Sequence, residues 1–212
     1  MVISSDLFEA YLDCPSKSWF RFRGEVASGN IFSQWLLKQS QSYRKEALKQ
    51  LRDSTHGDDF LIAPSQPMSI KRAKWRLAAD FVVRKDNLEA NIQAIERLSL
   101  RDKPDQFIPV RFVFVNKLTK RDKLVLAFDS LVFSEAFKYG INHGKIIYGD
   151  NFTKSKVKIP LLFREVRKIN GKIATLIVSN SPPEIVLNRH CPQCDFQHMC
   201  RKKAIAKLSG KG

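Results

Sequence analysis

Four cysteines constrain this chain more than any other feature of its sequence. Cys191, Cys194 and Cys200 share one short segment near the C-terminus, and Cys14 lies close to the N-terminus. No secretory signal precedes Cys14, so a disulfide framework is not expected. If all four sulfur atoms bind one metal centre, the two ends of the chain must meet in the fold.

Four thiolates at one point would hold either Zn²⁺ or an iron–sulfur cluster. A zinc ribbon usually has two Cys-x2-Cys pairs, each on one side of the tetrahedron. This chain has one such pair, Cys191 and Cys194, and its cysteines are split one plus three. That asymmetry favours a cubane cluster over zinc. The alternative is four buried, reduced cysteines that bind no metal. Three of the four lie in a polar segment, however, whereas buried cysteines without a metal are expected in apolar core segments.

The charge of the chain indicates a polyanionic partner. Its 212 residues include 37 Lys and Arg against 21 Asp and Glu, a net charge of +16. Such an excess is most often found in proteins that bind nucleic acid. No membrane partner is expected, because no basic amphipathic helix stands out and no apolar stretch approaches the roughly 20 residues of a membrane span. We expect a cytoplasmic protein.

Hydrophobic periodicity predicts an α/β fold in which helices flank a mixed sheet. The polar turn at 84–87 indicates a hairpin between two of the strands, and Thr119 and Gly140 are the expected ends of the longest central helix. One domain is expected, with an N-terminal helical part (1–56), a core (57–180), and a cysteine segment with a basic helix (181–207). The predicted helices are 4–24, 30–53, 118–139, 161–178 and 201–207; the predicted strands are 60–63, 76–83, 88–98, 108–115 and 145–149.

The two ends of the chain resemble a known nuclease family. The opening Ser5-Asp6-Leu7-Phe8, continued by Tyr11-Leu12-Asp13-Cys14-Pro15-Ser16-Lys17, is similar to RecB-type nucleases of the PD-(D/E)XK superfamily that carry an iron–sulfur staple. The segment from Cys191 to Lys202 is similar to their closing motif. CRISPR-associated nucleases and the AddB nuclease domain belong to this group, and 109–149 resembles a subgroup of RecB-like nucleases, some of which precede a helicase domain in the same chain.

The resemblance implies a restriction-endonuclease-like fold whose ends are joined by a 4Fe-4S cluster on Cys14, Cys191, Cys194 and Cys200. It also implies DNA cleavage by Mg²⁺ or Mn²⁺ held on two acids, with a Lys two residues after the second acid. Asp80 matches the first acid, and Glu96 is the best candidate for the second.

Two cationic groups of the family pattern are missing. Leu98 stands two residues after Glu96 where the family has Lys, and the helix at 30–53 contains no His. One hypothesis is therefore a nuclease with a variant site that acts on single-stranded DNA. The second is a degenerate pseudonuclease that binds nucleic acid or a partner without cutting. A third is a basic zinc-binding scaffold in a transposon or defence complex.

All three hypotheses would use a basic surface. DNA is the more expected nucleic acid, and a helicase or another DNA-processing protein is an expected partner. Lys154, Lys156 and Lys158 are expected to follow a loop, and Arg201, Lys202 and Lys203 to lie beside the cysteines. The main expected phosphate contacts are Lys71, Arg72, Lys74 and Arg76 before the Asp80 strand, and Lys117, Lys120, Arg121 and Lys123 at the start of the long helix.

Overall fold

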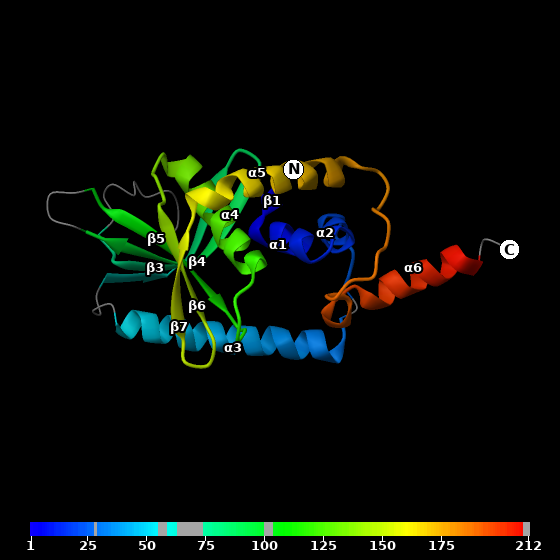
Figure 1. Ribbon diagram of the computed structural model, residues 1–212, viewed down its shortest axis with the longest axis horizontal. Helices are drawn as coiled ribbons and strands as arrows, with labels where there is room; N and C mark the ends of the chain where they lie inside the picture. Colours follow the sequence, from blue (N-terminus) through cyan, green and yellow to red (C-terminus); the bar gives the residue numbers. More distant parts are fainter. Residues whose placement is uncertain (28, 55–58, 63–73, 100–103, 210–212) are drawn as a thin grey trace.

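A mixed sheet of seven strands lies at the centre of the fold and is flanked by helices (Figure 1). The structure, a computed structural model, describes residues 1–27, 29–54, 59–62, 74–99 and 104–209. The α/β class predicted from the sequence is therefore confirmed. Within the described residues, no helix is both long enough and apolar enough to cross a bilayer.

The strands follow the chain almost in spatial order, β2-β3-β4-β5-β6-β7, and the short β1 pairs with β4 from outside this path. The β3–β4, β4–β5 and β6–β7 pairs are antiparallel, whereas β2–β3, β5–β6 and β1–β4 are parallel. The strands are β1 (Ile3–Ser4), β2 (Phe60–Ile62), β3 (Leu77–Lys85), β4 (Leu88–Leu98), β5 (Gln106–Val113), β6 (His143–Tyr148) and β7 (Thr153–Lys158).

One face of the sheet carries the main core. Helix α4 (Lys120–Phe137) crosses from β5 to β6 and buries a continuous apolar run from Leu124 to Phe128 against the strands. It begins at Thr119, as the sequence predicts, through a capping box with Asp122, but it ends on Lys138 in the left-handed conformation and not at Gly140. Helices α1 (Ser5–Asp13), α2 (Pro15–Phe22) and α5 (Pro160–Val178) lie on the same side.

The opposite face is covered by α3 (Ile31–Asp53), which runs along the lower edge of Figure 1. Its residues Tyr43, Ala47 and Leu51 pack with strand residues that include Leu77 and Val110. The first three turns of α3 have no buried residue. This helix therefore packs on the sheet with its second half only, and the first half overhangs it.

Three elements differ from the sequence prediction, the first being the short β1, which was not predicted. Residues 153–158, expected to follow a loop, form the edge strand β7, because they pair along their whole length with β6. Their apolar content is a single Val157, so the strand carries no hydrophobic signal. The last helix, α6 (Gln197–Ser209), begins four residues before the predicted start.

Candidate functional site

The structure brings the four cysteines together. Cys14 lies at the junction of α1 and α2, Cys191 and Cys194 lie in and just after a 3-10 turn (Cys191–Gln193), and Cys200 lies in α6. All four are free, partly exposed thiols. Burial and the neighbouring Cys194, Cys14 and Cys191 together raise the pKa of Cys200 to about 11. The segment around Cys14 therefore meets the C-terminal cysteine segment, as a shared centre would require.

The sulfur atoms have polar neighbours of the kind that metal-bound thiolates use. Cys191 Sγ accepts a hydrogen bond from the Asn188 backbone N–H (3.3 Å), and Cys194 Sγ accepts one from Phe196 N–H (3.4 Å). An all-sulfur donor set suits Zn²⁺ or an iron–sulfur cluster. Among the described residues, however, no group of three or more His, Cys, Asp or Glu side chains is arranged to hold a metal ion. The thiols are neighbours and do not form a closed metal cage.

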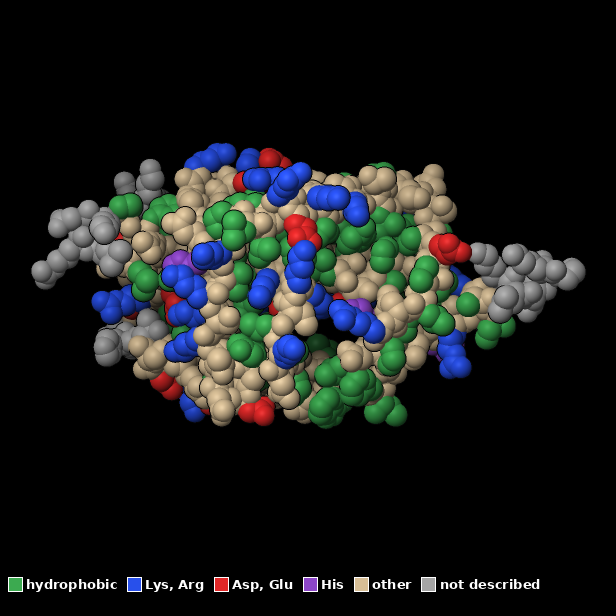
Figure 2. All heavy atoms as spheres, viewed as in Figure 1, with side chains coloured by type: hydrophobic (Ala, Val, Ile, Leu, Met, Phe, Trp, Pro, Cys, Tyr) green, Lys and Arg blue, Asp and Glu red, His purple; other side chains and the backbone are tan. Residues whose placement is uncertain are grey.

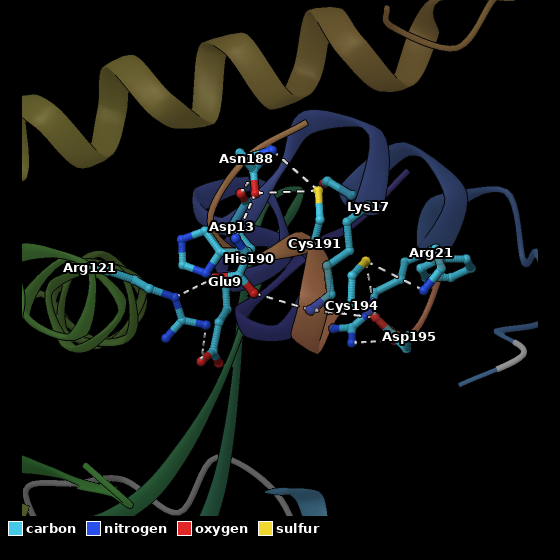
Figure 3. A network of polar contacts seen from close by, with 12 residues as sticks. Glu9, Asp13, Lys17, Arg21, Arg121, Asn188, His190, Cys191, Cys194 and Asp195 are labelled. Carbon is cyan, nitrogen blue, oxygen red and sulfur yellow. Dashed lines mark hydrogen bonds and ion pairs between the residues drawn. The ribbon is translucent and has the colours of Figure 1, made fainter. Parts of the chain in front are cut away.

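A network of ion pairs joins the cysteine segment to the body of the protein (Figure 3). The Asp13 backbone carbonyl accepts a hydrogen bond from the Asn188 side chain (3.3 Å), and its carboxylate pairs with Arg121 Nε (2.5 Å) and Lys17 (3.1 Å). Lys17 also reaches Asp195 at 3.5 Å. Helices α1, α2 and α4 are thus tied through charged groups to the segment that contains Cys191 and Cys194.

The same network continues into the core. Glu9 pairs with Arg121 (2.9 Å) and with the buried Arg111 (2.6 Å) of β5. Burial alone would raise the pKa of Glu9, but the two guanidinium groups outweigh it and hold this pKa at about 2. Arg121 is therefore ion-paired with Glu9 and Asp13 within the protein, and this does not fit the phosphate contact expected of it.

The two predicted catalytic acids are each held by a cation from another element. Arg44 of α3 donates to the Asp80 carboxylate, and Lys145 of β6 pairs with Glu96 at 2.5 Å. In the β3–β4 ladder Glu96 lies opposite Leu77, and Leu77 precedes Asp80 by three residues along β3. The acids are therefore not cross-strand neighbours, and neither position presents a free carboxylate.

The β3–β4 ladder is irregular where Asp80 lies. Ala79 pairs with Ala94 and Phe81 with Ile92, so the register is the same on both sides, but the Asp80–Gln93 pair between them is missing and Asp80 has a left-handed φ of 54°. Leu77 packs under α3 while Phe81 packs on the α4 face, although residues four apart share a face in a regular strand. Such irregularities re-aim a side chain, and here Asp80 faces α3. On the partner strand, the side-chain oxygen of Gln93 accepts from Phe112 N–H (2.7 Å).

A row of lysines lies beside this region on the same face of the sheet. Lys154, Lys156 and Lys158 alternate along β7, are exposed, and lie opposite Ile147, Lys145 and His143 of β6. Directly opposed residues share a face, and Ile147 belongs to the cluster under α3. Burial lowers the pKa of His143, and the nearby Lys156 and Lys145 lower it further. Figure 2 shows Lys and Arg side chains gathered over this edge.

The other predicted phosphate contacts are scattered. Lys74, Lys117 and Lys123 are exposed, whereas Arg76 pairs with Asp59 (3.3 Å) and Lys120 with Glu165 (2.8 Å). Lys71 and Arg72 lie outside the described residues. Neither Arg44 nor Lys145 was singled out from the sequence. Only the strand register could have indicated Lys145. This lysine pairs with Val110 of β5, and Val110 pairs with Ala94, which lies two residues from Glu96 on the same face of β4.

Comparison with known proteins adds little to this picture. No family model matches the chain, and no curated protein matches it. A solved structure described as "Crystal structure of SSO0001" is similar, with a TM-score of 0.40 and 14% sequence identity over 77% of this chain and 96% of that chain. A likeness of that size carries no argument about activity. Conclusions about function therefore depend on the residues of this chain.

Proposed function

We propose that this protein binds nucleic acid, independently of sequence, through the face formed by β6 and β7. The single observation that carries the proposal is the lysine row of β7. Lys154, Lys156 and Lys158 are exposed on one face, and Lys145 and His143 lie beside them. Cations at every second residue of a strand are spaced at roughly 6.6 Å, close to the phosphate spacing of a nucleic acid strand. The net charge of +16 supports the same partner.

We propose further that binding occurs without cutting. Metal-assisted hydrolysis needs free carboxylates to hold the cation, with a separate cation near the developing phosphate charge. Here Asp80 is paired with Arg44, and Glu96 is paired with Lys145. DNA is the expected nucleic acid ligand, and a helicase or other DNA-processing protein remains the expected partner. These pairs fit best a degenerate member of the PD-(D/E)XK group, in which Arg44 and Lys145 pair with the two carboxylates that would otherwise hold the metal.

A second candidate is a variant metal-dependent nuclease. One observation favours it: a conspicuous irregularity turns Asp80 to the face that also carries Glu96 and Lys145. Lys145 would then supply the cation that is missing two residues after Glu96. Mg²⁺ or Mn²⁺ would bind Asp80 and Glu96, and the ion pairs with Arg44 and Lys145 would have to open first.

We propose that the four cysteines hold a 4Fe-4S cluster, with zinc as the alternative. The all-sulfur donor set and the two backbone N–H donors to sulfur support this assignment. Cys14, Cys191, Cys194 and Cys200 would be the ligands. When bound, the cluster would supply a covalent staple between the chain ends. Beside the cysteines, Lys17 is ion-paired with Asp13 and Arg21 with Asp195, so the surroundings of the proposed cluster are already joined by ion pairs.

The binding face can be tested by removing its charge. In the triple variant Lys154→Gln, Lys156→Gln and Lys158→Gln, we expect weaker binding of a labelled single strand, measured by fluorescence anisotropy over a salt series. The slope of log affinity against log salt should flatten by about 2, since each phosphate contact contributes ~0.7 on a single strand.

A matched control is available on the other side of the sheet. Arg164, Lys168 and Lys172 are exposed on α5, and changing all three to Gln removes the same charge. We expect this control to keep most of the salt slope. An equal loss in both triple variants would mean that binding follows net charge and has no defined face, and would overturn the proposal.

A further inference from the structure

We propose that the overhanging start of α3 is a stacking platform for unpaired bases, so that the protein prefers single-stranded to duplex nucleic acid. The inference rests on the proposed function and names its substrate class. Two large aromatic side chains at the start of α3 are exposed to solvent, Phe32 at 46% and Trp35 at 47%. Their rings stack with centroids 5.8 Å apart and planes at 13°. Figure 2 shows apolar side chains gathered at this end of α3.

The platform continues toward the lysine row as an unbroken series of aromatic contacts. Trp35 meets Phe114 at 6.4 Å, Phe114 meets Tyr43 at 5.9 Å, and Tyr43 stacks on Phe152 at 5.0 Å. Phe152 lies in the β6–β7 turn, two residues before Lys154. An aromatic path from α3 therefore ends where the basic strand begins. Tyr43 is buried within this series, so bases would stack on the exposed Phe32 and Trp35 at one end of it, and phosphates would lie on the lysines at the other end.

The start of α3 is held in place, as a platform requires. Gly29 N–H donates to the Asp195 carbonyl (2.9 Å), and the Asn30 side chain donates to the Cys194 carbonyl (3.3 Å). Asn30 also caps the helix through a capping box with Ser33. These bonds attach the overhang to the cysteine segment, so the exposed rings lie on a fixed support.

Charge favours nucleic acid over a protein as the occupant of this surface. Lys38 is exposed on α3 one turn after Trp35, and the lysine row lies at the far end of the aromatic path. One acid, the exposed Asp150, lies in the β6–β7 turn. Base–aromatic stacking needs an exposed ring and no particular base, which matches sequence-independent binding. A duplex keeps its bases paired and cannot use the rings.

The test compares Trp35→Ala with Leu161→Ala, which truncates another exposed apolar residue, 77% exposed on α5. Anisotropy would be measured with oligothymidylate of about 16 nucleotides and with a duplex of equal length. We expect Trp35→Ala to weaken single-strand binding roughly tenfold and duplex binding little, since stacking is worth that much per base. Leu161→Ala should change neither affinity.

Intrinsic fluorescence gives an independent readout. Trp19 and Trp75 are buried, at 7% and 6% exposed, so an oligonucleotide that quenches tryptophan emission should act on Trp35. We expect quenching in the wild type and its loss in Trp35→Phe, which keeps a stacking ring and most of the affinity. Equal binding of both nucleic acids, or an unchanged Trp35→Ala affinity, would overturn the platform while leaving the proposed function intact. Failure of the wild type to bind either would overturn both.

Discussion

Asp129 is the residue whose ionisation the fold changes most clearly. It is buried in α4 and accepts a hydrogen bond from Ser5 Oγ (2.5 Å), which in turn accepts one from Asn91 N–H (3.0 Å). Burial raises the pKa of Asp129 to about 7, although Arg111 and Ser5 act in the opposite direction. The folded protein therefore keeps a proton on this carboxyl that the unfolded chain releases near pH 4.

This shift predicts a pH-dependent stability. Below pH 4 the carboxyl is neutral in both states, and its contribution is fully present. Between pH 4 and 7 only the unfolded chain ionises, so the free energy of unfolding falls by up to about 4 kcal/mol. In Asp129→Asn the fall should shrink, because Asn does not titrate and still accepts from Ser5. Urea unfolding at pH 4.5 and 8 checks this; parallel profiles for both proteins would contradict it.

Glu96 carries the prediction that concerns the binding face. Its carboxylate neutralises Lys145 beside the lysine row and also acts on His143. Glu96→Gln should therefore raise affinity for a single strand roughly threefold, the value of one partly exposed charge pair. Glu135→Gln is the matched control, because Glu135 is also ion-paired, with Arg167, but on the opposite side of the sheet. Weaker binding by Glu96→Gln would contradict the account.

The sequence pointed to single residues of the site better than to their partners. The resemblance to the nuclease family singled out Asp80 and Glu96 as the two acids, and Asp80 also stands out as a carboxylate in an apolar strand. Arg44 and Lys145 could not be picked out, since each lies on an element far away in the chain and reaches its acid only through tertiary structure. The left-handed backbone of Asp80 was equally hidden, because nothing in Ala79-Asp80-Phe81 departs from an ordinary strand pattern.

At the scale of elements, periodicity predicted the helices and strands that bury apolar residues. Helices α3 and α5 and strands β3 to β6 lie within a few residues of the predicted ranges. The failure was β7, whose alternation of Lys with Thr, Ser and Val has almost no hydrophobic content. Backbone pairing with β6 stabilises β7 as a strand, although its side chains lack the apolar pattern that predicts one. The proposed function depends on this element.

The contact between α2 and the cysteine segment supports a stability prediction. Phe20 and Phe196 are fully buried and tilt against each other at 5.5 Å, with Trp19 beside them. Phe196→Ala should lower the free energy of unfolding by about 3 kcal/mol, the usual cost of emptying a buried Phe site. Leu161→Ala should change it by less than about 0.5 kcal/mol. A loss below 1 kcal/mol for Phe196→Ala would mean that the two chain ends are only loosely packed.

At the scale of the whole molecule, the chain closes on itself. Cys14 and Cys191 bracket almost the whole sequence, and ion pairs, hydrogen bonds and aromatic packing already join their surroundings. A metal centre across these ends would remove unfolded-chain entropy in the way that a long disulfide loop does.

Loss of that metal centre should therefore lower the free energy of unfolding of the whole protein. We expect Cys14→Ser to lose bound iron or zinc and to lower the unfolding free energy by several kcal/mol, on the order of 4. Wild-type protein treated with a chelator should converge on the stability of the variant. Metal analysis, visible absorption and urea unfolding on the same samples check this. Equal stability of the metal-loaded wild type and Cys14→Ser would show that the cysteines are not a staple.

We expect the protein to hold nucleic acid without hydrolysing it. The most direct measurement incubates the protein with an end-labelled single strand and Mn²⁺, then examines the same mixture on native and denaturing gels. We expect a retarded complex on the native gel and a full-length strand on the denaturing gel at every time point. Shortening of the strand that requires Mn²⁺ and disappears in Asp80→Ala would contradict it and identify the variant nuclease instead.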